Sequence, residues 1–257
     1  MEKPRVIAVI PARMGSSRYP GKPLVEILGL PMVEHVRRRA ELCPAVDEVV
    51  VATCDREIFD LVVARGGKAV MTADTHERCT ERVEEAMRSL DGDIVAIVQG
   101  DEPLLIPEAV TAIVAPLVDD AAVECSNLLS TIADAADLKD RNIVKAALDQ
   151  EGYVMYFSRA SIPYFRHSGD APVYRQTGIW ALRKDFLRTY VDWPETPFER
   201  VESIDMLRVL ERGHRIRGVV MDYTTIGVDN PGDVAKVERL LSADARQKAL
   251  HESVVRL

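Results

Sequence analysis

An apolar segment near the N-terminus, residues 6–10, runs directly into a loop that is rich in small residues and cations. An uninterrupted apolar run of this length predicts a buried strand of a parallel sheet. The loop, residues 11–24, holds two glycines, two serines and the three cations Arg13, Arg18 and Lys22. Small residues let backbone N–H groups approach phosphate oxygens, and the cations can donate charge-assisted hydrogen bonds to them. The segment therefore predicts a site for a nucleoside triphosphate, the alternative being a basic surface loop.

The spacing in this loop excludes two familiar phosphate-binding motifs. A P-loop needs four residues between its first glycine and a Gly-Lys pair, followed by Ser or Thr. Here five residues separate Gly15 from Gly21, and Pro23 stands where the hydroxyl would be. No G-x-G-x-x-G follows any predicted strand, so the dinucleotide-binding fingerprint fails as well. The loop must belong to another class of phosphate-binding segment.

Composition indicates an ordinary globular protein, either one large domain or a domain with a sizeable insertion. Of the 257 residues, 47% are hydrophobic, and the formal net charge is −8. Such a chain lacks the extended positive field that non-specific binding to nucleic acid or to an anionic membrane needs. No apolar run reaches the roughly 20 residues of a membrane span, and no signal peptide is expected before Val6. The four cysteines show no metal-ligand spacing, so we expect reduced thiols in a cytoplasmic protein.

Two kinds of pattern divide the chain. The first half alternates short β-branched runs with amphipathic stretches, which predicts an α/β fold with a mostly parallel sheet flanked by helices. Shorter β-like pieces then predict a smaller antiparallel β insertion at about residues 120–190, within a single domain spanning 1–257. A helix is expected over 199–213, a final helix begins near Gly232, and the C-terminal tail is the one candidate for disorder. The expected strands of the first half are 6–10, 49–53, 68–71 and 93–98, and its helices are 32–41, 55–65, 80–90 and one that begins at residue 107.

Two carboxylates follow later strands and are candidate magnesium ligands. Asp101 comes after the apolar run 93–98, so it is expected in the same crevice as the cationic loop. A carboxylate among triphosphate oxygens would repel them unless a cation intervenes, and Mg²⁺ is the usual bridge. Asp229 follows a Gly-Val pair near the end of the chain and is the second candidate. The alternatives are a turn-forming Asp101 and an Asp229 that caps the helix beginning near Pro231.

Several motifs agree in their order with one enzyme family. The cationic loop reads PAR-x-x-SSR-x-PGK-x-L, which is similar to the start of sugar-nucleotide pyrophosphorylases. Further matching pieces are residues 51–53, 80–82, 98–103, 156–163, 190–193, 207–210 and 227–229. Over most of its length the chain resembles the 3-deoxy-manno-octulosonate cytidylyltransferases, which are CMP-acidic-sugar synthetases. The resemblance implies a CTP-dependent nucleotidyltransferase with a Rossmann-like core of the nucleotide-diphospho-sugar transferase type, an antiparallel insertion for acceptor binding and dimerisation, and a homodimer.

Carried over residue by residue, the resemblance implies roles for the candidate residues. The catalytic and phosphate-binding residues would be Arg13, Ser16, Arg18, Lys22 and Asp101. Mg²⁺ would lie on Asp101 and Asp229. The nucleotide pocket would include Thr80, Arg82 and Gln99. In that pocket Cys79 stands where the family has a Gly, which leaves the strictness of the cytosine preference open.

The region expected to hold the acidic sugar departs from the family pattern. Arg159 and Arg175 are the candidates for the acceptor carboxylate, because a guanidinium can bind it through two hydrogen bonds, and the alternative is ion pairing within the insertion. Gln176 replaces an expected His and cannot become cationic. Asp205 and Met206 replace an expected Glu-Gln pair, which implies a pocket with different hydroxyl partners.

The predicted reaction is attack by an acceptor hydroxyl on the α-phosphorus of CTP, which transfers CMP to an acidic sugar such as 3-deoxy-manno-octulosonate and releases pyrophosphate. The changed acceptor region leaves two alternatives open. One is a nucleotidyltransferase for another 2-keto-3-deoxy acid or a phosphonate. The other is a nucleotide-binding protein that has lost catalysis. Lipopolysaccharide or capsule synthesis would use the product, and neither nucleic acid nor membrane is an expected partner.

Overall fold

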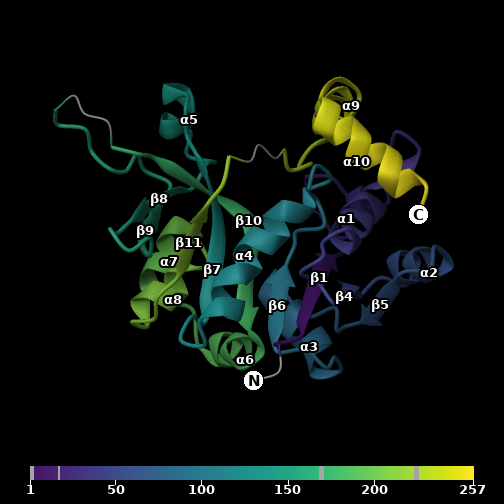
Figure 1. Ribbon diagram of the computed structural model, residues 1–257, viewed down its shortest axis with the longest axis horizontal. Coiled ribbons are helices and arrows are strands. Elements are labelled where there is room, and N and C mark those ends of the chain that lie inside the picture. The colour runs from purple at the N-terminus through teal and green to yellow at the C-terminus, as the bar shows by residue number, and fades with distance from the viewer. Residues whose placement is uncertain (1–2, 17, 168–170, 223–225) are drawn as a thin grey trace. The chain divides into compact units, whose positions relative to one another are not determined.

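A computed structural model describes residues 3–16, 18–167, 171–222 and 226–257 of the protein (Figure 1). The chain forms two compact units. The core unit comprises Met1–Thr111 and Thr225–Leu257, and the inserted unit comprises Ala112–Thr224. The inserted unit therefore extends past both ends of the expected 120–190 segment. No helix in the described ranges is both long and apolar enough to cross a membrane.

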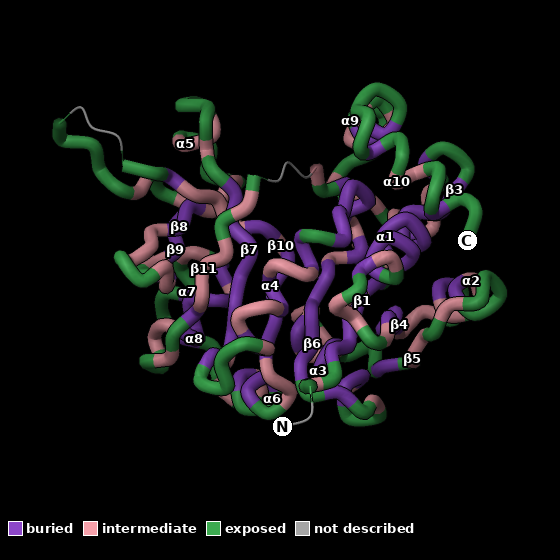
Figure 2. Tube along the Cα trace, in the orientation of Figure 1, coloured by how far each residue is buried: buried purple, intermediate pink, exposed green. Residues whose placement is uncertain are grey.

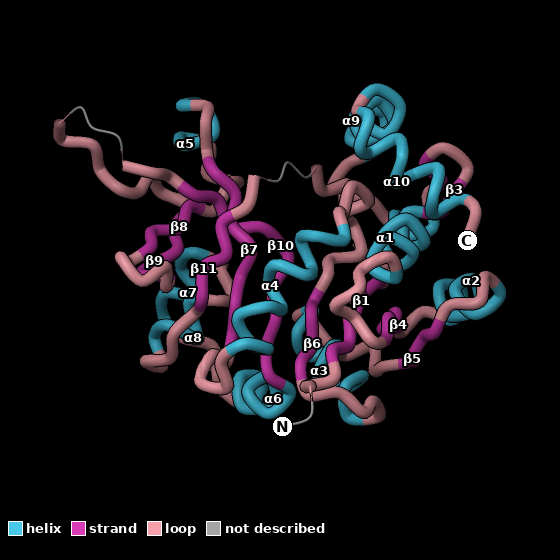
Figure 3. The backbone as a smooth tube through the Cα atoms, in the orientation of Figure 1, coloured by secondary structure: helices cyan, strands magenta, loops and turns pink. Residues whose placement is uncertain are grey.

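The core unit is built on parallel strands in the order β6-β1-β4-β5 (Figure 3). The chain therefore moves outward from β1 through β4 to β5, and then returns to the other side of β1 with β6. This reversal of direction between β1 and β6 is where ligands of doubly wound sheets bind, beyond the carboxyl ends of the strands. The strands are β1 (Val6–Ala12), β4 (Glu48–Thr53), β5 (Lys68–Met71) and β6 (Ile94–Ile97).

Burial explains why these segments form strands. Every residue of β6, and Val6 to Ile10 of β1, is fully buried (Figure 2). Continuous apolar runs are typical of strands covered on both faces. β5 lies at one end of the strand order and is only partly buried, as its short polar-flanked sequence predicts. The intervening helices of the core unit are α1 (Met32–Glu41), α2 (Arg56–Ala64) and α3 (Cys79–Arg88), and α4 (Pro107–Asp119) begins in it.

The C-terminal part of the core unit contains two helices, α9 (Pro231–Ala243) and α10 (Ala245–Val255). The expected helix near Gly232 is confirmed. The expectation of a disordered tail is wrong, because α10 packs against α1 through polar side chains that hydrophobic periodicity does not reveal. Arg38 of α1 donates to the Val254 carbonyl at 2.8 Å, and the rings of His35 and His251 stack with centroids 5.3 Å apart.

The inserted unit is a mixed sheet. β7 (Cys125–Thr131) pairs antiparallel with β10 (Tyr174–Arg183) and parallel with β11 (Arg217–Val220). A hairpin of β8 (Lys145–Leu148) and β9 (Val154–Ser158) joins β10 antiparallel. The predicted antiparallel pairing within 120–190 is thus confirmed for β7, β8, β9 and β10, and the parallel strand β11 lies outside that segment. The remaining helices of this unit are α5 (Ala135–Lys139), α6 (Lys184–Asp192), α7 (Pro197–Glu202) and α8 (Leu207–Glu211).

The prediction of a single helix over 199–213 is wrong. Two short helices replace it, because Ser203 adopts a left-handed conformation with φ +52 and ends α7. Glu199 and Arg208, from α7 and α8, form a buried ion pair with two hydrogen bonds, at 2.6 and 2.8 Å. This pair draws the two helices together and favours a corner over a continuous helix.

Candidate active site

The site lies where the loops after β1 and β6 meet. Gly100 follows β6 and packs on β1 so closely that a Cβ atom there would be 2.9 Å from the Pro11 carbonyl oxygen. A side chain would push the two loops apart, so the position requires glycine. The backbone N–H of Val228 donates to the Asp101 carbonyl at 2.9 Å. These contacts bring both predicted metal ligands, Asp101 and Asp229, to the same edge of the sheet.

Lys22 lies between the two carboxylates. Its Nζ donates to Asp101 Oδ2 at 2.6 Å and to the Val228 carbonyl at 3.1 Å, and it is 3.6 Å from Asp229 Oδ1. The Lys22 side chain is 15% exposed, whereas those of Asp101 and Asp229 are 31% and 43% exposed. The ammonium group thus compensates two carboxylates that remain accessible to a ligand. Charge-assisted bonds of this length are strong, so the arrangement is well ordered.

The cationic loop is folded back on itself. The backbone N–H groups of Ser16 and Gly21 both donate to the Met14 carbonyl at 3.0 Å, and Gly21 has φ +74, which favours glycine. The Met14 N–H donates to Asp55 Oδ2 at 2.8 Å, which ties the loop to the end of β4. The signal that could have found Asp55 is its place directly after a buried strand.

The other loop cations reach the site to different extents. Arg18 donates to Asp229 Oδ1 at 2.9 Å, and its side chain is 64% exposed. Arg13 is exposed and makes no ion pair with any other residue that the structure describes. Ser16 accepts a hydrogen bond from the Tyr19 N–H through its hydroxyl at 3.3 Å. Arg13 and Arg18 are therefore accessible cations at the carboxyl end of β1, as expected for groups that would meet phosphate.

Comparison with known proteins agrees with this geometry. The family model described as "Cytidylyltransferase" matches residues 7–216. The 3-deoxy-manno-octulosonate cytidylyltransferase of Geobacter metallireducens is 42% identical over 249 residues, which cover 93% of this chain and 98% of the relative. The chain belongs to the 3-deoxy-manno-octulosonate cytidylyltransferase family. A relative of the same name from Syntrophus aciditrophicus is 41% identical and covers 96% of this chain and 100% of its own.

Solved structures support the family and the fold. The structure of a CMP:2-keto-3-deoxy-manno-octonic acid synthetase complexed with CTP matches with a TM-score of 0.89 and 40% identity, over 93% of this chain and 98% of that one. A 4-diphosphocytidyl-2C-methyl-D-erythritol synthase from Anaerococcus prevotii matches with a TM-score of 0.64 at 15% identity, over 93% and 96%. The second match shows a shared fold alone. The predicted Rossmann-like α/β fold and the predicted family are confirmed.

The residues predicted for the nucleotide pocket of this cytidylyltransferase lie at or near the N-terminus of α3 and the end of β6. Thr80 and Arg82 are almost fully buried, at 2% and 3% exposure. Arg82 donates to the Thr72 hydroxyl and the Ala73 carbonyl, so it holds the loop between β5 and α3. Gln99 Nε2 donates to Cys79 Sγ at 3.5 Å. Cys79 is therefore accommodated through a side-chain contact that a glycine could not make.

The residues predicted for the acceptor lie in the inserted unit and have different surroundings. The Arg159 guanidinium donates to the carbonyls of Glu202, Arg141 and Ser203 at 2.7, 3.1 and 3.2 Å. These bonds favour a structural role within the unit over binding of the acceptor carboxylate. Arg175 Nε donates to the Ser130 hydroxyl at 3.0 Å.

The three substituted positions of the acceptor region are also placed in the inserted unit. Gln176 lies beside Arg175 on β10 and is half-buried. The Asp205 carbonyl accepts a hydrogen bond from the Tyr190 hydroxyl at 3.1 Å. Met206 is 3% exposed, so it packs inside the unit. Gln176 and Asp205 are therefore partly accessible, whereas Met206 is not.

The donor set at Lys22 fits magnesium. No group of three or more His, Cys, Asp or Glu side chains in the described part of the chain could hold a metal ion by itself. Mg²⁺ does not require such a group, because it is commonly bound by one or two carboxylates together with substrate phosphates and water. Asp101 and Asp229 supply two carboxylates already gathered around one cation, the Lys22 ammonium.

Proposed function

We propose that this protein transfers CMP from CTP to 3-deoxy-manno-octulosonate and releases pyrophosphate. The observation that carries the proposal is the cluster of Lys22, Asp101 and Asp229 at the reversal point of the core sheet. The name shared by the relatives and the CTP complex of the matching structure support the nucleotide and the acceptor. No protein nucleophile is needed, because the acceptor hydroxyl itself attacks phosphorus.

In this mechanism a P–O bond forms between the acceptor hydroxyl oxygen and the α-phosphorus, and the bond from that phosphorus to the bridging oxygen of the β-phosphate breaks. The pair of electrons leaves with pyrophosphate, and the proton of the acceptor hydroxyl is lost to solvent. Arg13, Arg18 and Lys22 would hold and orient the phosphates and offset their charge. Asp101 and Asp229 would hold Mg²⁺, which when bound supplies charge stabilisation and alignment of the phosphate oxygens.

Fewer contacts support the proposal for how the acceptor is bound. Arg175, Gln176 and Asp205 would contribute to binding of the acidic sugar, and the first two are consecutive residues of β10, whereas Arg159 has a structural role. Because Gln176 lacks the positive charge of a protonated His, a different 2-keto-3-deoxy acid or a phosphonate is the second candidate acceptor. We also propose a cytoplasmic homodimer that acts in lipopolysaccharide synthesis.

The first test is acceptor-dependent release of pyrophosphate. Purified protein is incubated with Mg²⁺, CTP and a panel of 2-keto-3-deoxy acids that includes 3-deoxy-manno-octulosonate, with ATP, GTP and UTP as controls. Release that needs both CTP and that sugar is the expected result. Release with another acid would replace the acceptor and keep the chemistry, and silence with every acid would contradict the proposed transfer. Sedimentation of the same sample tests the homodimer.

A further inference from the structure

Helix α10 reaches the loop that carries Asp101 through buried polar side chains. Gln247 of α10 is 8% exposed, and its Nε2 donates to the Leu104 carbonyl at 2.9 Å. Arg39 of α1 is fully buried and donates both to the Leu105 carbonyl at 2.9 Å and to Gln247 Oε1 at 2.8 Å. Two successive carbonyls of the loop thus bind to one pair of side chains. A buried amide and guanidinium arranged in this way fix the loop backbone in one position.

Backbone hydrogen bonds close the loop between Asp101 and these carbonyls. The Glu102 N–H donates to the Gln99 carbonyl at 3.2 Å, and the Leu105 N–H donates to the Glu102 carbonyl at 3.1 Å. Two consecutive turns therefore connect the bonded carbonyls to Asp101. From Asp101 the chain of contacts continues to the second carboxylate, since its own carbonyl accepts the Val228 N–H. A displacement at residues 104–105 would be transmitted to both carboxylates.

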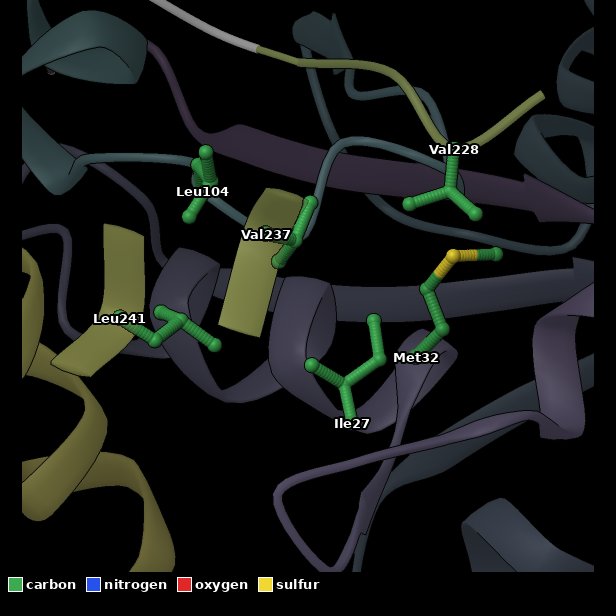
Figure 4. Packing of buried hydrophobic residues seen from close by; sticks show 6 residues of the cluster. All are labelled: Ile27, Met32, Leu104, Val228, Val237 and Leu241. Carbon is green, nitrogen blue, oxygen red and sulfur yellow. The ribbon is translucent and has the colours of Figure 1, made fainter. Parts of the chain in front are cut away.

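The apolar cluster beneath the site follows the same path. Leu104 and Val228, one from each carboxylate-bearing segment, pack with Val237 and Leu241 of α9 (Figure 4). Ile27 and Met32 complete the cluster from the segment that follows Lys22. The C-terminal helices thus support all three segments that supply Lys22, Asp101 and Asp229.

We propose that Gln247, together with Arg39, is a positioning residue for the Asp101 and Asp229 carboxylates. The inference rests on the proposed function, because it assigns these carboxylates to the bound nucleotide and its metal. Gln247 touches neither; it acts by holding residues 104–105. The competing explanation is that Gln247 merely docks α10 and affects stability alone.

The structure offers matched variants for this test. Gln247→Met keeps the side-chain volume and removes both hydrogen bonds. Gln247→Glu keeps an acceptor for Arg39 and removes the donor to Leu104, so it docks α10 even if the Met variant folds poorly. Arg38→Met is the control, because Arg38 binds α10 at the Val254 carbonyl and contacts Glu34, but has no bond to residues 104–105.

Two readouts separate positioning from stability. Backbone hydrogen exchange of peptides covering residues 99–106 and 226–230 should rise about tenfold in Gln247→Met, and less in Gln247→Glu, since each lost bond weakens the closed loop. The kcat/KM for CTP should fall about tenfold, with a higher Mg²⁺ requirement. Arg38→Met should leave the exchange rates and the kcat/KM for CTP unchanged, even if it lowers the Tm as much as Gln247→Met does.

Equal exchange in the Gln247 and Arg38 variants, or unchanged exchange at 99–106 in both Gln247 variants, would overturn the proposal. If the wild-type protein shows no turnover with CTP, the proposed function fails by itself. The exchange measurement still decides whether Gln247 holds the Asp101 loop.

Discussion

The core unit and the inserted unit use buried cations in opposite ways. In the core unit, Lys22 is held by the carboxylates Asp101 and Asp229, both of which remain partly exposed. In the inserted unit, Lys145 is fully buried and donates to the carbonyls of Asp140, Ile143 and Arg159. The first arrangement leaves charge available to a ligand, whereas the second uses charge to satisfy loop backbone.

The comparison shows that a cation in a matching motif is not sufficient evidence of a binding role. Arg159 and Lys22 both lie in segments that match the family. Arg159, however, joins the same network of backbone carbonyls as Lys145, whereas Lys22 faces ionised side chains and one carbonyl. Burial also lowers the pKa of the Lys145 ammonium, which the Asp140 and Glu202 carboxylates only partly oppose. What decides a role is the set of partners, which only the fold supplies.

The largest effect is expected for Asp101→Asn. The change removes one charge and little volume from a partly exposed side chain, so the fold should persist while turnover with CTP falls about a thousandfold. Steady-state kinetics at saturating Mg²⁺, with circular dichroism for the fold, measure this. Asp60→Asn, at an exposed pair with Arg56, is the control and should be active. Full activity in Asp101→Asn would remove this carboxylate from the site.

Acid is expected to weaken the core unit at the contact between α1 and α10. Burial, opposed by the hydrogen bond to the Ile27 carbonyl and aided by Arg39, lowers the pKa of His35 to about 4. The unfolded chain, with a pKa near 6.5, then takes up the proton first. This contribution to stability is present above pH 6.5 and is lost as the pH falls towards 4, by about 3 kcal/mol in total.

Urea unfolding at several pH values between 7 and 4 measures that loss. His35→Gln retains a donor for the Ile27 carbonyl but does not titrate, so its free energy of unfolding should depend less steeply on pH. A variant as steep as the wild-type protein would show that His35 does not carry the dependence.

Removing the Lys22 ammonium tests whether this cation of the core unit serves a ligand. Lys22→Met should lower kcat/KM for CTP about a hundredfold, because a charge-assisted donor to the phosphates is lost and the two carboxylates lose their counter-ion. Lys236→Met, which removes an exposed ammonium paired with Asp233 on α9, serves as the control. If both variants used CTP equally well, Lys22 would be structural like Lys145.

The structural role of Arg159 in the inserted unit predicts that its removal affects stability but not acceptor binding. Arg159→Met leaves three loop carbonyls without their donor and should lower the free energy of unfolding by about 2 kcal/mol. The KM for the acceptor should remain within about twofold of the wild-type value, because the guanidinium is already bonded. Chemical unfolding and acceptor titration measure the two quantities. A raised KM for the acceptor with unchanged stability would show that Arg159 binds the acceptor.

The smallest expected effect is a change in acceptor preference. Gln176→His restores a group that can become cationic at this position, so kcat/KM for 3-deoxy-manno-octulosonate should rise about threefold. The gain should be larger below pH 6.5, where an unperturbed histidine is protonated. Competition between two acid acceptors, with Gln176→Asn as a neutral control, measures the preference. No pH-dependent gain would show that this position does not contact the acid.

Much of the core unit follows from its sequence. The buried strands are continuous apolar runs, and each ends where the charged residues begin, so the meeting of Lys22 and Asp101 could be predicted from strand order alone. Asp229 follows a Gly-Val pair, which makes it a candidate ligand, but its contact with Lys22 could be predicted only through the family resemblance. More than a hundred residues separate Asp101 from Asp229, and no local pattern encodes that distance.

The packing of α10 and the corner at Ser203 could not be predicted, because both are formed by polar residues that a sequence pattern assigns to the surface. The inner face of α10 presents Gln247, His251 and Val254, so two of its three positions are polar and the helix lacks an apolar stripe. Its partners on α1 are equally polar. The corner at Ser203 is hidden in the same way, since the buried Glu199–Arg208 pair reads in sequence as an exposed helical surface.

Gly100 fixes the distance between two backbone segments of the site. Because its α-carbon rests against the backbone of β1, the spacing between the segment that precedes the cationic loop and the segment that carries Asp101 is set by main-chain contact. Side-chain substitutions elsewhere can alter which groups are presented, but not how far apart these two backbones begin. Substitutions in the inserted unit therefore leave the spacing of the segments that carry Lys22 and Asp101 unchanged.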